Sequence, residues 1–121
     1  MAEGLGPSGA NVGLDAILAA HPWVKLHVGA PGAAGTSNPA AETTRKQATW
    51  AASSGGASSN TNALQWAPVG GSEDYTHFSL WSASTAGNFG LSGQITANPV
   101  VTGDTFTVAI GDLDVSFPLA S

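Results

Sequence analysis

The chain has 121 residues and a net charge of −5, and only 9% of its residues are charged. This length fits a single domain of ordinary size. Three cations are too few to neutralise nucleic-acid phosphates or an anionic membrane surface, and the absence of cysteine excludes disulfide bonds and thiolate metal sites.

The low charge also predicts how the surface is used. An average globular protein has about 25% charged residues, so Ser, Thr, Asn, Gly and Ala must cover most of this surface. Such a surface is expected of a protein that is largely in contact with copies of itself or with partner proteins. A GC-rich genome, which raises the Ala and Gly content, is the alternative explanation.

The glycine-rich segment Met1–Ala10 is interpreted as an N-terminal arm, and residues 11–121 as a single domain. The segment lacks the basic start and apolar run of a secretory signal, and no stretch has the roughly 20 apolar residues that cross a bilayer. We therefore expect a soluble protein made in the cytoplasm. The first predicted element is a helix that Asn11 caps and that ends near Ala20, because His21-Pro22 cannot continue it.

The pattern then changes to period two, which predicts a strand over Trp23–Gly29 with one apolar face. A long loop follows over Ala30–Glu42, and loops of this length in compact domains are usually functional or held by a partner. Thr44–Ser53 is the next strand candidate, Ser54–Asn60 is a flexible connector, and a third strand contains Leu64 and Trp66.

Tyr75–Ser82 is the strongest predicted strand, and its aromatic residues lie on both faces. This pattern predicts a strand that is covered on both sides or that lies in an interface. The sequence Ala86-Gly87-Asn88 predicts a hairpin turn after it. The remaining strand candidates are Phe89 with Leu91, Gln94–Ala97 limited by Pro99, Thr105–Ile110 and Leu113–Leu119.

Seven or eight short strands at spacings near ten residues, separated by Gly and Pro, predict the fold class. We expect a mainly β protein, an antiparallel β-sandwich or jelly roll, with one short N-terminal helix.

No catalytic residue is predicted, because the hydrolase motif G-x-S-x-G does not occur and abundant Ser and Thr are only composition. His27 and His77 lie on strand candidates and could bind a metal with Glu73 or Asp74. Single hydrogen bonds to the backbone, or exposure to solvent, explain these histidines more simply. We therefore expect no enzyme, no cofactor and no metal.

Three aspartates near the C-terminus, Asp104, Asp112 and Asp114, could bind calcium through their carboxylates. Gly-Asp pairs at turns are explained more simply by Asx-type hydrogen bonds to the local backbone, which we prefer.

The four tryptophans could either fill the core or bind sugars. Large aromatic side chains on the strands of a thin sandwich are expected to fill its core. An exposed aromatic platform that stacks on sugar rings is the alternative, and Trp81 is its main candidate, because its strand is apolar on both faces. The other three are Trp23, Trp50 and Trp66.

Several segments, in the same order along the chain, resemble small virion proteins of tailed bacteriophages, especially those that infect actinobacteria. The resemblance extends from about Val12 over nearly the whole chain, and Ala30 stands where that family more commonly has Asp. The segments are Leu26–Gly32, Glu42–Lys46, Thr49–Ala52, Phe78–Ala83, Gly87–Phe89 and Gly103–Val108.

The resemblance implies a structural protein of the virion, located in the particle and made in the host cytoplasm. We expect a capsid accessory or decoration subunit that makes multivalent contacts with its neighbours. The alternative is a minor tail or tail-fibre protein with a receptor- or carbohydrate-binding role. The expected partners are other virion proteins, from the capsid or the tail, and copies of the chain itself.

We expect a homo-oligomer, with a trimer, a ring and a lattice-placed monomer all compatible with the sequence. The assembly contacts are expected in the irregular parts of the chain and on the two-faced strand. The candidate contact residues are Leu5, Pro7, Pro31, Asn38, Pro39 and Trp81.

Overall fold

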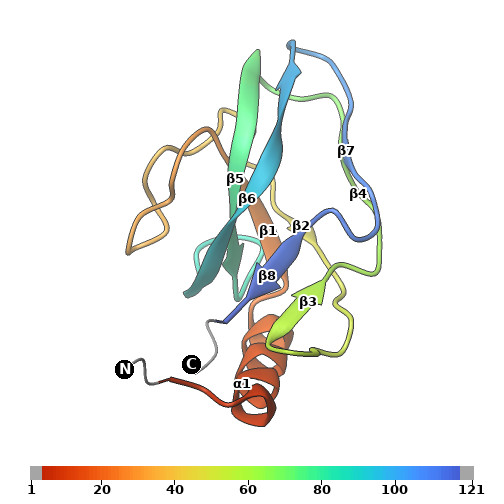
Figure 1. The fold of residues 1–121 in the computed structure, drawn as a ribbon. Helices are drawn as coiled ribbons and strands as arrows, with labels where there is room; N and C mark the ends of the chain where they lie inside the picture. The colour runs from red at the N-terminus through yellow and green to blue at the C-terminus, as the bar shows by residue number, and fades with distance from the viewer. Residues whose placement is uncertain (1–3, 118–121) are drawn as a thin grey trace.

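The computed structural model describes residues 4–117, except the side chains of residues 96–98. One helix, α1 (Pro7–Ala20), precedes all the strands (Figure 1). Eight strands follow in this part of the chain, which agrees with the seven or eight predicted. They are β1 (Trp23–His27), β2 (Lys46–Gln47), β3 (Ala57–Ser59), β4 (Leu64–Trp66), β5 (Glu73–Trp81), β6 (Phe89–Val100), β7 (Phe106–Val108) and β8 (Asp114–Ser116).

The strands form one four-stranded sheet and two two-stranded ribbons, and every pairing is antiparallel. The order in the large sheet is β2-β1-β5-β6, so β2 and β6 are its edges. The ribbons, β3-β8 and β4-β7, lie on one side of this sheet, with α1 at one end (Figure 1). The mainly β, sandwich-like fold with a short N-terminal helix is therefore confirmed.

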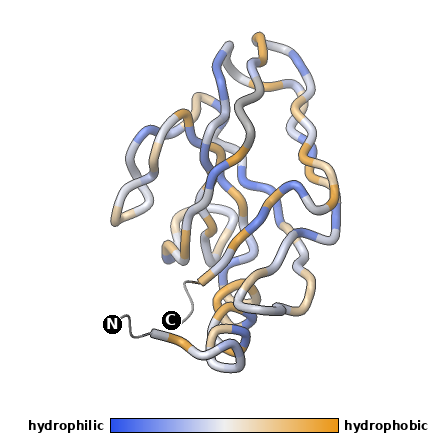
Figure 2. The backbone as a smooth tube through the Cα atoms, in the orientation of Figure 1, coloured by the Kyte–Doolittle hydropathy of each residue, from blue (hydrophilic) through white to orange (hydrophobic). Residues whose placement is uncertain are grey.

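A single apolar core fills the space between the large sheet and the ribbons. Polar and apolar residues alternate along the strands, which places the apolar ones on this inner side (Figure 2). Trp66 is fully buried, and its indole Nε1 donates a hydrogen bond to the carbonyl of Thr44 at 2.7 Å. The main core residues are Leu14, Leu18, Val24, Leu26, Leu64, Trp66, Val69, Tyr75, Phe78, Leu80, Phe106, Val108, Leu113 and Val115.

The helix begins five residues earlier than predicted. Gly6 is its N-cap and Pro7 occupies the first turn, where the fixed φ and missing N–H of proline do no harm. Asn11 therefore does not cap the helix; its Oδ1 accepts a hydrogen bond from the Gly56 N–H at 2.8 Å. The predicted end at Ala20 is confirmed. No helix within residues 4–117 has the length and apolarity needed to cross a membrane.

Three strand predictions need correction. The predicted flexible connector Ser54–Asn60 contains β3. The candidate Thr44–Ser53 shrinks to the two residues of β2, and Trp50 beyond it forms an isolated bridge with Asn60. Phe89 to Val100 is one continuous strand rather than two, and Pro99 lies within it. Proline is tolerated there because β6 is an edge strand, so its missing N–H breaks no ladder.

The predicted hairpin turn is confirmed, with Ala86 and Gly87 at positive φ between β5 and β6. The predicted last strand is shortened to β8, and Leu119 lies outside the described residues.

Candidate functional site

The long loop Ala30–Glu42 folds back onto the second face of the large sheet. In the middle of the loop, Gly35 lies so close to Phe89 that an added Cβ would overlap the ring. Near its end, the Ala41 N–H donates to the Glu73 carboxylate, at 2.8 Å and 3.0 Å from its two oxygens. The loop is thus held by the chain itself, and β5 is covered on both sides, as predicted.

A chain of hydrogen bonds joins this loop to β1 and β5. The Trp81 Nε1–H donates to Ser79 Oγ at 2.7 Å, and Ser79 Oγ lies 2.7 Å from His27 Nε2. His27 Nδ1 lies 2.9 Å from the carbonyl oxygen of Ser37, which can only accept, so Nδ1 carries the proton. Nε2 is then the acceptor for the Ser79 hydroxyl, and burial holds the pKa of His27 below its usual value.

Trp81 offers no open platform to a sugar ring. Its side chain is 8% exposed. The Arg45 guanidinium lies 4.5 Å from its ring centroid, and the Phe89 ring centroid is 5.6 Å away. Arg45 is held there because its Nη1 donates to the carbonyls of Ala83 and Ala86, at 2.9 Å and 2.6 Å.

The six predicted contact residues do not form one surface. Pro31 and Trp81 are buried within the chain, so we do not carry them into the proposals below. Asn38 and Pro39 are exposed on the loop. The remaining two, Leu5 and Pro7, are exposed at the start of α1, and their role in assembly stays a prediction.

Two open clefts lie next to each other near Trp50. Each has a volume of about 490 Å³, and they share Ala51 and Ala52. Trp50 is half-buried, and its indole Nε1 is buried without a hydrogen-bond partner among the described residues. The first cleft also contacts Asp15, Leu18, Ala19, Pro22, Gln47, Ala48 and Thr49.

Within residues 4–117, the single hydrogen bond to a backbone carbonyl that the sequence favoured is found only at His21, because His27 has two partners and His77 bonds to a side-chain hydroxyl. His21 Nδ1 lies 2.8 Å from the Ile17 carbonyl, and His77 Nδ1 lies 2.9 Å from Thr76 Oγ1. His27 and His77 pair across β1 and β5, but both ring nitrogens of His27 are already used. No three His, Cys, Asp or Glu side chains gather into a metal site in the described part of the chain.

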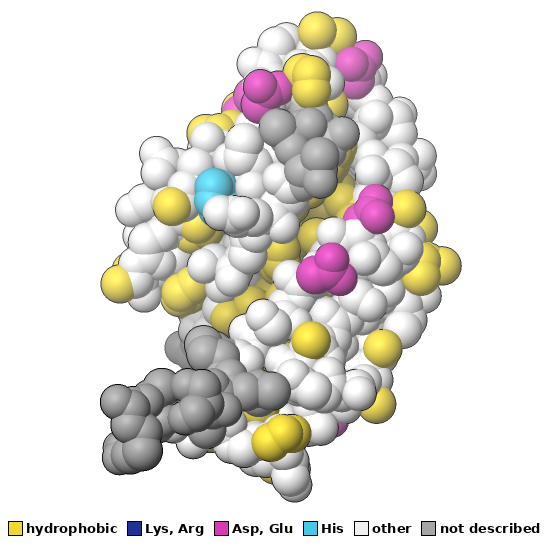
Figure 3. All heavy atoms as spheres, viewed as in Figure 1, with side chains coloured by type: hydrophobic (Ala, Val, Ile, Leu, Met, Phe, Trp, Pro, Cys, Tyr) yellow, Lys and Arg dark blue, Asp and Glu magenta, His cyan; other side chains and the backbone are white. Residues whose placement is uncertain are grey.

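The C-terminal aspartates form the predicted local turns. Asp104 Oδ2 accepts from the Val101 N–H at 3.0 Å, and Asp112 Oδ2 accepts from the Ala109 N–H at 3.3 Å. Asp112 and Asp114 line a groove of about 370 Å³ between β6 and the β7–β8 turn, and its floor is apolar. On this side of the molecule Figure 3 shows Asp and Glu side chains but no Lys or Arg.

The cations lie at the other edge of the large sheet. Lys25 is on β1, Lys46 is on β2, and Arg45 directly precedes β2. Burial lowers the pKa of Lys25, and the positive charge of Arg45 lowers it further. Sequence reasoning missed this separation of charge, although the small number of cations was the signal that could have revealed it.

The comparisons with known proteins identify the family. No curated protein matches the chain. The family model described as podophage GP4 fiber I protein gp80 matches residues 12–116. This match supports a phage structural protein of the fibre type and favours the fibre alternative over the expected capsid decoration role, which is not confirmed. The chain belongs to the family of the podophage GP4 fiber I protein gp80.

Proposed function

We propose that this chain is a structural subunit of a fibre on the phage particle, in contact with copies of itself and with other virion proteins. The observation that supports this most directly is the family match, which extends over residues 12–116 and therefore includes every strand. The low proportion of charged residues adds independent support, because such a surface suits permanent contact with other proteins.

The test is to locate the chain on the particle. Purified virions are labelled with gold-coupled antibody against the recombinant protein and imaged by electron microscopy, and its copy number is measured by quantitative mass spectrometry. We expect label on fibres and a low copy number. Label spread over the capsid at hundreds of copies, or no label on virions at all, would refute the proposal.

A second candidate function is recognition of a saccharide on the host surface. Its specific support is the open cleft at Trp50, which combines a half-buried indole with the polar side chains of Asp15, Gln47 and Thr49. A glycan array compares the wild type with Trp50→Ala. Trp81→Phe is the control, because the Trp81 indole is buried and does not line the cleft. Binding that Trp50→Ala leaves unchanged would exclude this cleft.

We also propose that the chain acts without catalysis. His27 is the most buried histidine, and its two nitrogens are occupied by Ser37 and Ser79 in a network that joins loop and sheet. A hydrolase screen on purified protein tests this. Turnover that a single Ser or His substitution abolishes in a folded variant would refute it.

A further inference from the structure

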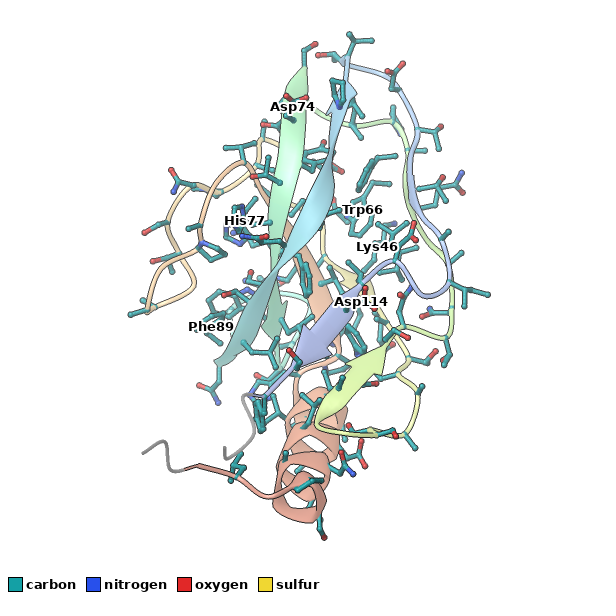
Figure 4. All side chains as sticks on the ribbon, in the orientation of Figure 1. Lys46, Trp66, Asp74, His77, Phe89 and Asp114 are labelled. Atoms are coloured by element: carbon teal, nitrogen blue, oxygen red, sulfur yellow. The ribbon has the colours of Figure 1, made fainter. Side chains whose placement is uncertain are left out.

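The charges of this chain are separated across its large sheet. All three cations come from β1, β2 and the residue before β2, at one edge of the order β2-β1-β5-β6. Beyond the opposite edge, β6, lies the groove with Asp112 and Asp114. Asp114 lies on β8 at the front of the view in Figure 4.

The basic side is a hollow of about 460 Å³ lined by Lys25, Arg45, hydroxyl side chains and Ala86. Two like charges side by side in a partly buried place disfavour each other. Burial and the charge of Arg45 lower the pKa of Lys25, and burial lowers the pKa of Arg45. Within residues 4–117, no carboxylate offsets the charge of Lys25 or Arg45. A partner surface that supplied carboxylates would therefore stabilise the two cations of this hollow.

The acidic side has the complementary composition. Asp112 and Asp114 are exposed at the rim of the groove, whereas Ile95, Phe106 and Val108 form its apolar floor. This groove runs beside β6, which pairs only with β5 among the described strands. A strand edge that is unpaired in the subunit is a site at which another chain readily adds.

We propose that the acidic groove beside β6 of one copy binds the basic β1–β2 edge of a second copy. Opposite charges on two different surfaces of one subunit produce a head-to-tail contact, since each copy presents one surface of each kind. Such contacts close into a ring or continue along a fibre, according to the rotation between successive copies. The inference rests on the proposed fibre role for its setting, but it is tested on the purified chain alone.

The experiment uses two charge-reversal variants that have opposite defects. Lys25→Glu makes the basic hollow acidic and spares Arg45, which packs on Trp81. Lys46 is left unchanged, because it pairs with the core residue Val24 and does not line the hollow. Asp112→Lys with Asp114→Lys makes the acidic groove basic. Asp74→Lys is the matched control, because it reverses an exposed acid that does not line the groove. Circular dichroism and thermal melting establish that each variant is folded.

Sedimentation velocity then measures association at increasing concentration and at low and high salt. We expect the wild type and Asp74→Lys to associate, and the association to weaken at high salt because exposed charges are screened. Each charge-reversal variant is expected to lower the association constant at least about tenfold, because like charges then face each other. An equal mixture of the two variants is expected to recover association, since each supplies the surface that the other has lost.

The outcomes separate clearly. Variants that associate as strongly as the wild type, or a mixture that stays dissociated, would overturn the proposed contact. A wild type that stays monomeric at all concentrations would also overturn it. The same holds if the monomer's basic hollow binds an acidic polysaccharide, such as polygalacturonate, in place of a second copy. If Asp112→Lys/Asp114→Lys does not fold, Asp114→Lys alone keeps the Asp112 turn and repeats the test. The fibre proposal fails separately, when the chain is found elsewhere on virions or not at all.

Discussion

The two faces of the large sheet are buried by different means. On the inner face, apolar side chains such as Leu26 and Phe78 pack against the ribbons and α1. On the outer face, the long loop is joined through the Ser37 carbonyl to a hydrogen-bonded row that contains His27, Ser79 and Trp81. In Figure 4, His77 and Phe89 lie on the loop side, and Trp66 lies on the opposite side toward β4 and β7.

This difference shows how one strand pattern can serve two kinds of packing. The inner face gains its stability from apolar burial, which is tolerant of geometry. The outer face depends on matched donors and acceptors, and a buried polar group that loses its partner is costly. Substitutions on the two faces should therefore differ in size and in character.

The largest effect is expected on the inner face. Phe78→Ala removes a fully buried ring from the middle of β5 and should lower the free energy of unfolding by about 3–5 kcal/mol. Chemical denaturation monitored by tryptophan fluorescence measures this loss. The control is Val28→Ala, where the side chain is 40% exposed and the change should be small. Equal losses at the two sites would contradict the assignment of the core.

A smaller effect is expected on the outer face. Ser79→Ala leaves the Trp81 indole N–H and His27 Nε2 without a partner, so the free energy of unfolding should fall by about 1–3 kcal/mol. Ser92→Ala is the matched control, because Ser92 pairs with Ser79 across β5 and β6 but is exposed. If both serines tolerate alanine equally, the hydrogen-bonded row does not stabilise the protein.

A third substitution tests how the loop Ala30–Glu42 packs on the sheet, without changing His27, Ser79 or Trp81. Gly35→Ala places a methyl group against the Phe89 ring at a φ of +73°, and should cost about 1–3 kcal/mol more than Gly55→Ala. Gly55 also has positive φ but nothing within 4 Å of the added Cβ, so it isolates the backbone strain from the clash. Hydrogen exchange should show faster exchange over residues 30–42 in Gly35→Ala alone.

The smallest expected effect concerns pH. Because the folded-state pKa of His27 is lowered from 6.5, the unfolded state binds more protons as the pH falls below that value. The neutral imidazole thus stabilises the fold above pH 6.5, and this stability is lost as the pH falls through the lowered pKa. His27→Gln should flatten this part of the stability curve, which chemical denaturation at a series of pH values measures. A curve unchanged by His27→Gln would contradict the role assigned to the buried imidazole.

The inner face and the strand candidates were largely predictable from the sequence. Alternation over Trp23–Gly29 and the aromatic-rich segment Tyr75–Ser82 predicted β1 and β5, and the turn at Gly87 joined β5 to β6. These patterns are local, since a strand with one buried face must alternate. Pro99 misled the prediction for β6, because the sequence alone does not show which strand lies at an edge.

The contacts of the outer face were not predictable in the same way. His27 and Ser79 are 52 positions apart, and nothing near either residue indicates the other. The separation of the cations from the groove at Asp112 and Asp114 has the same origin, because it depends on the order of strands in the sheet.

The sequence by itself determined the strand periodicity, the turns, the exclusion of disulfides and the virion family, because these depend on neighbouring residues or on the order of short segments along the chain. The tertiary structure alone decided that Arg45 and Phe89 cover Trp81, that Trp50 borders an open cleft, and that opposite charges lie at opposite edges. Those features arise when strands distant in the chain are placed side by side, which local propensity does not specify.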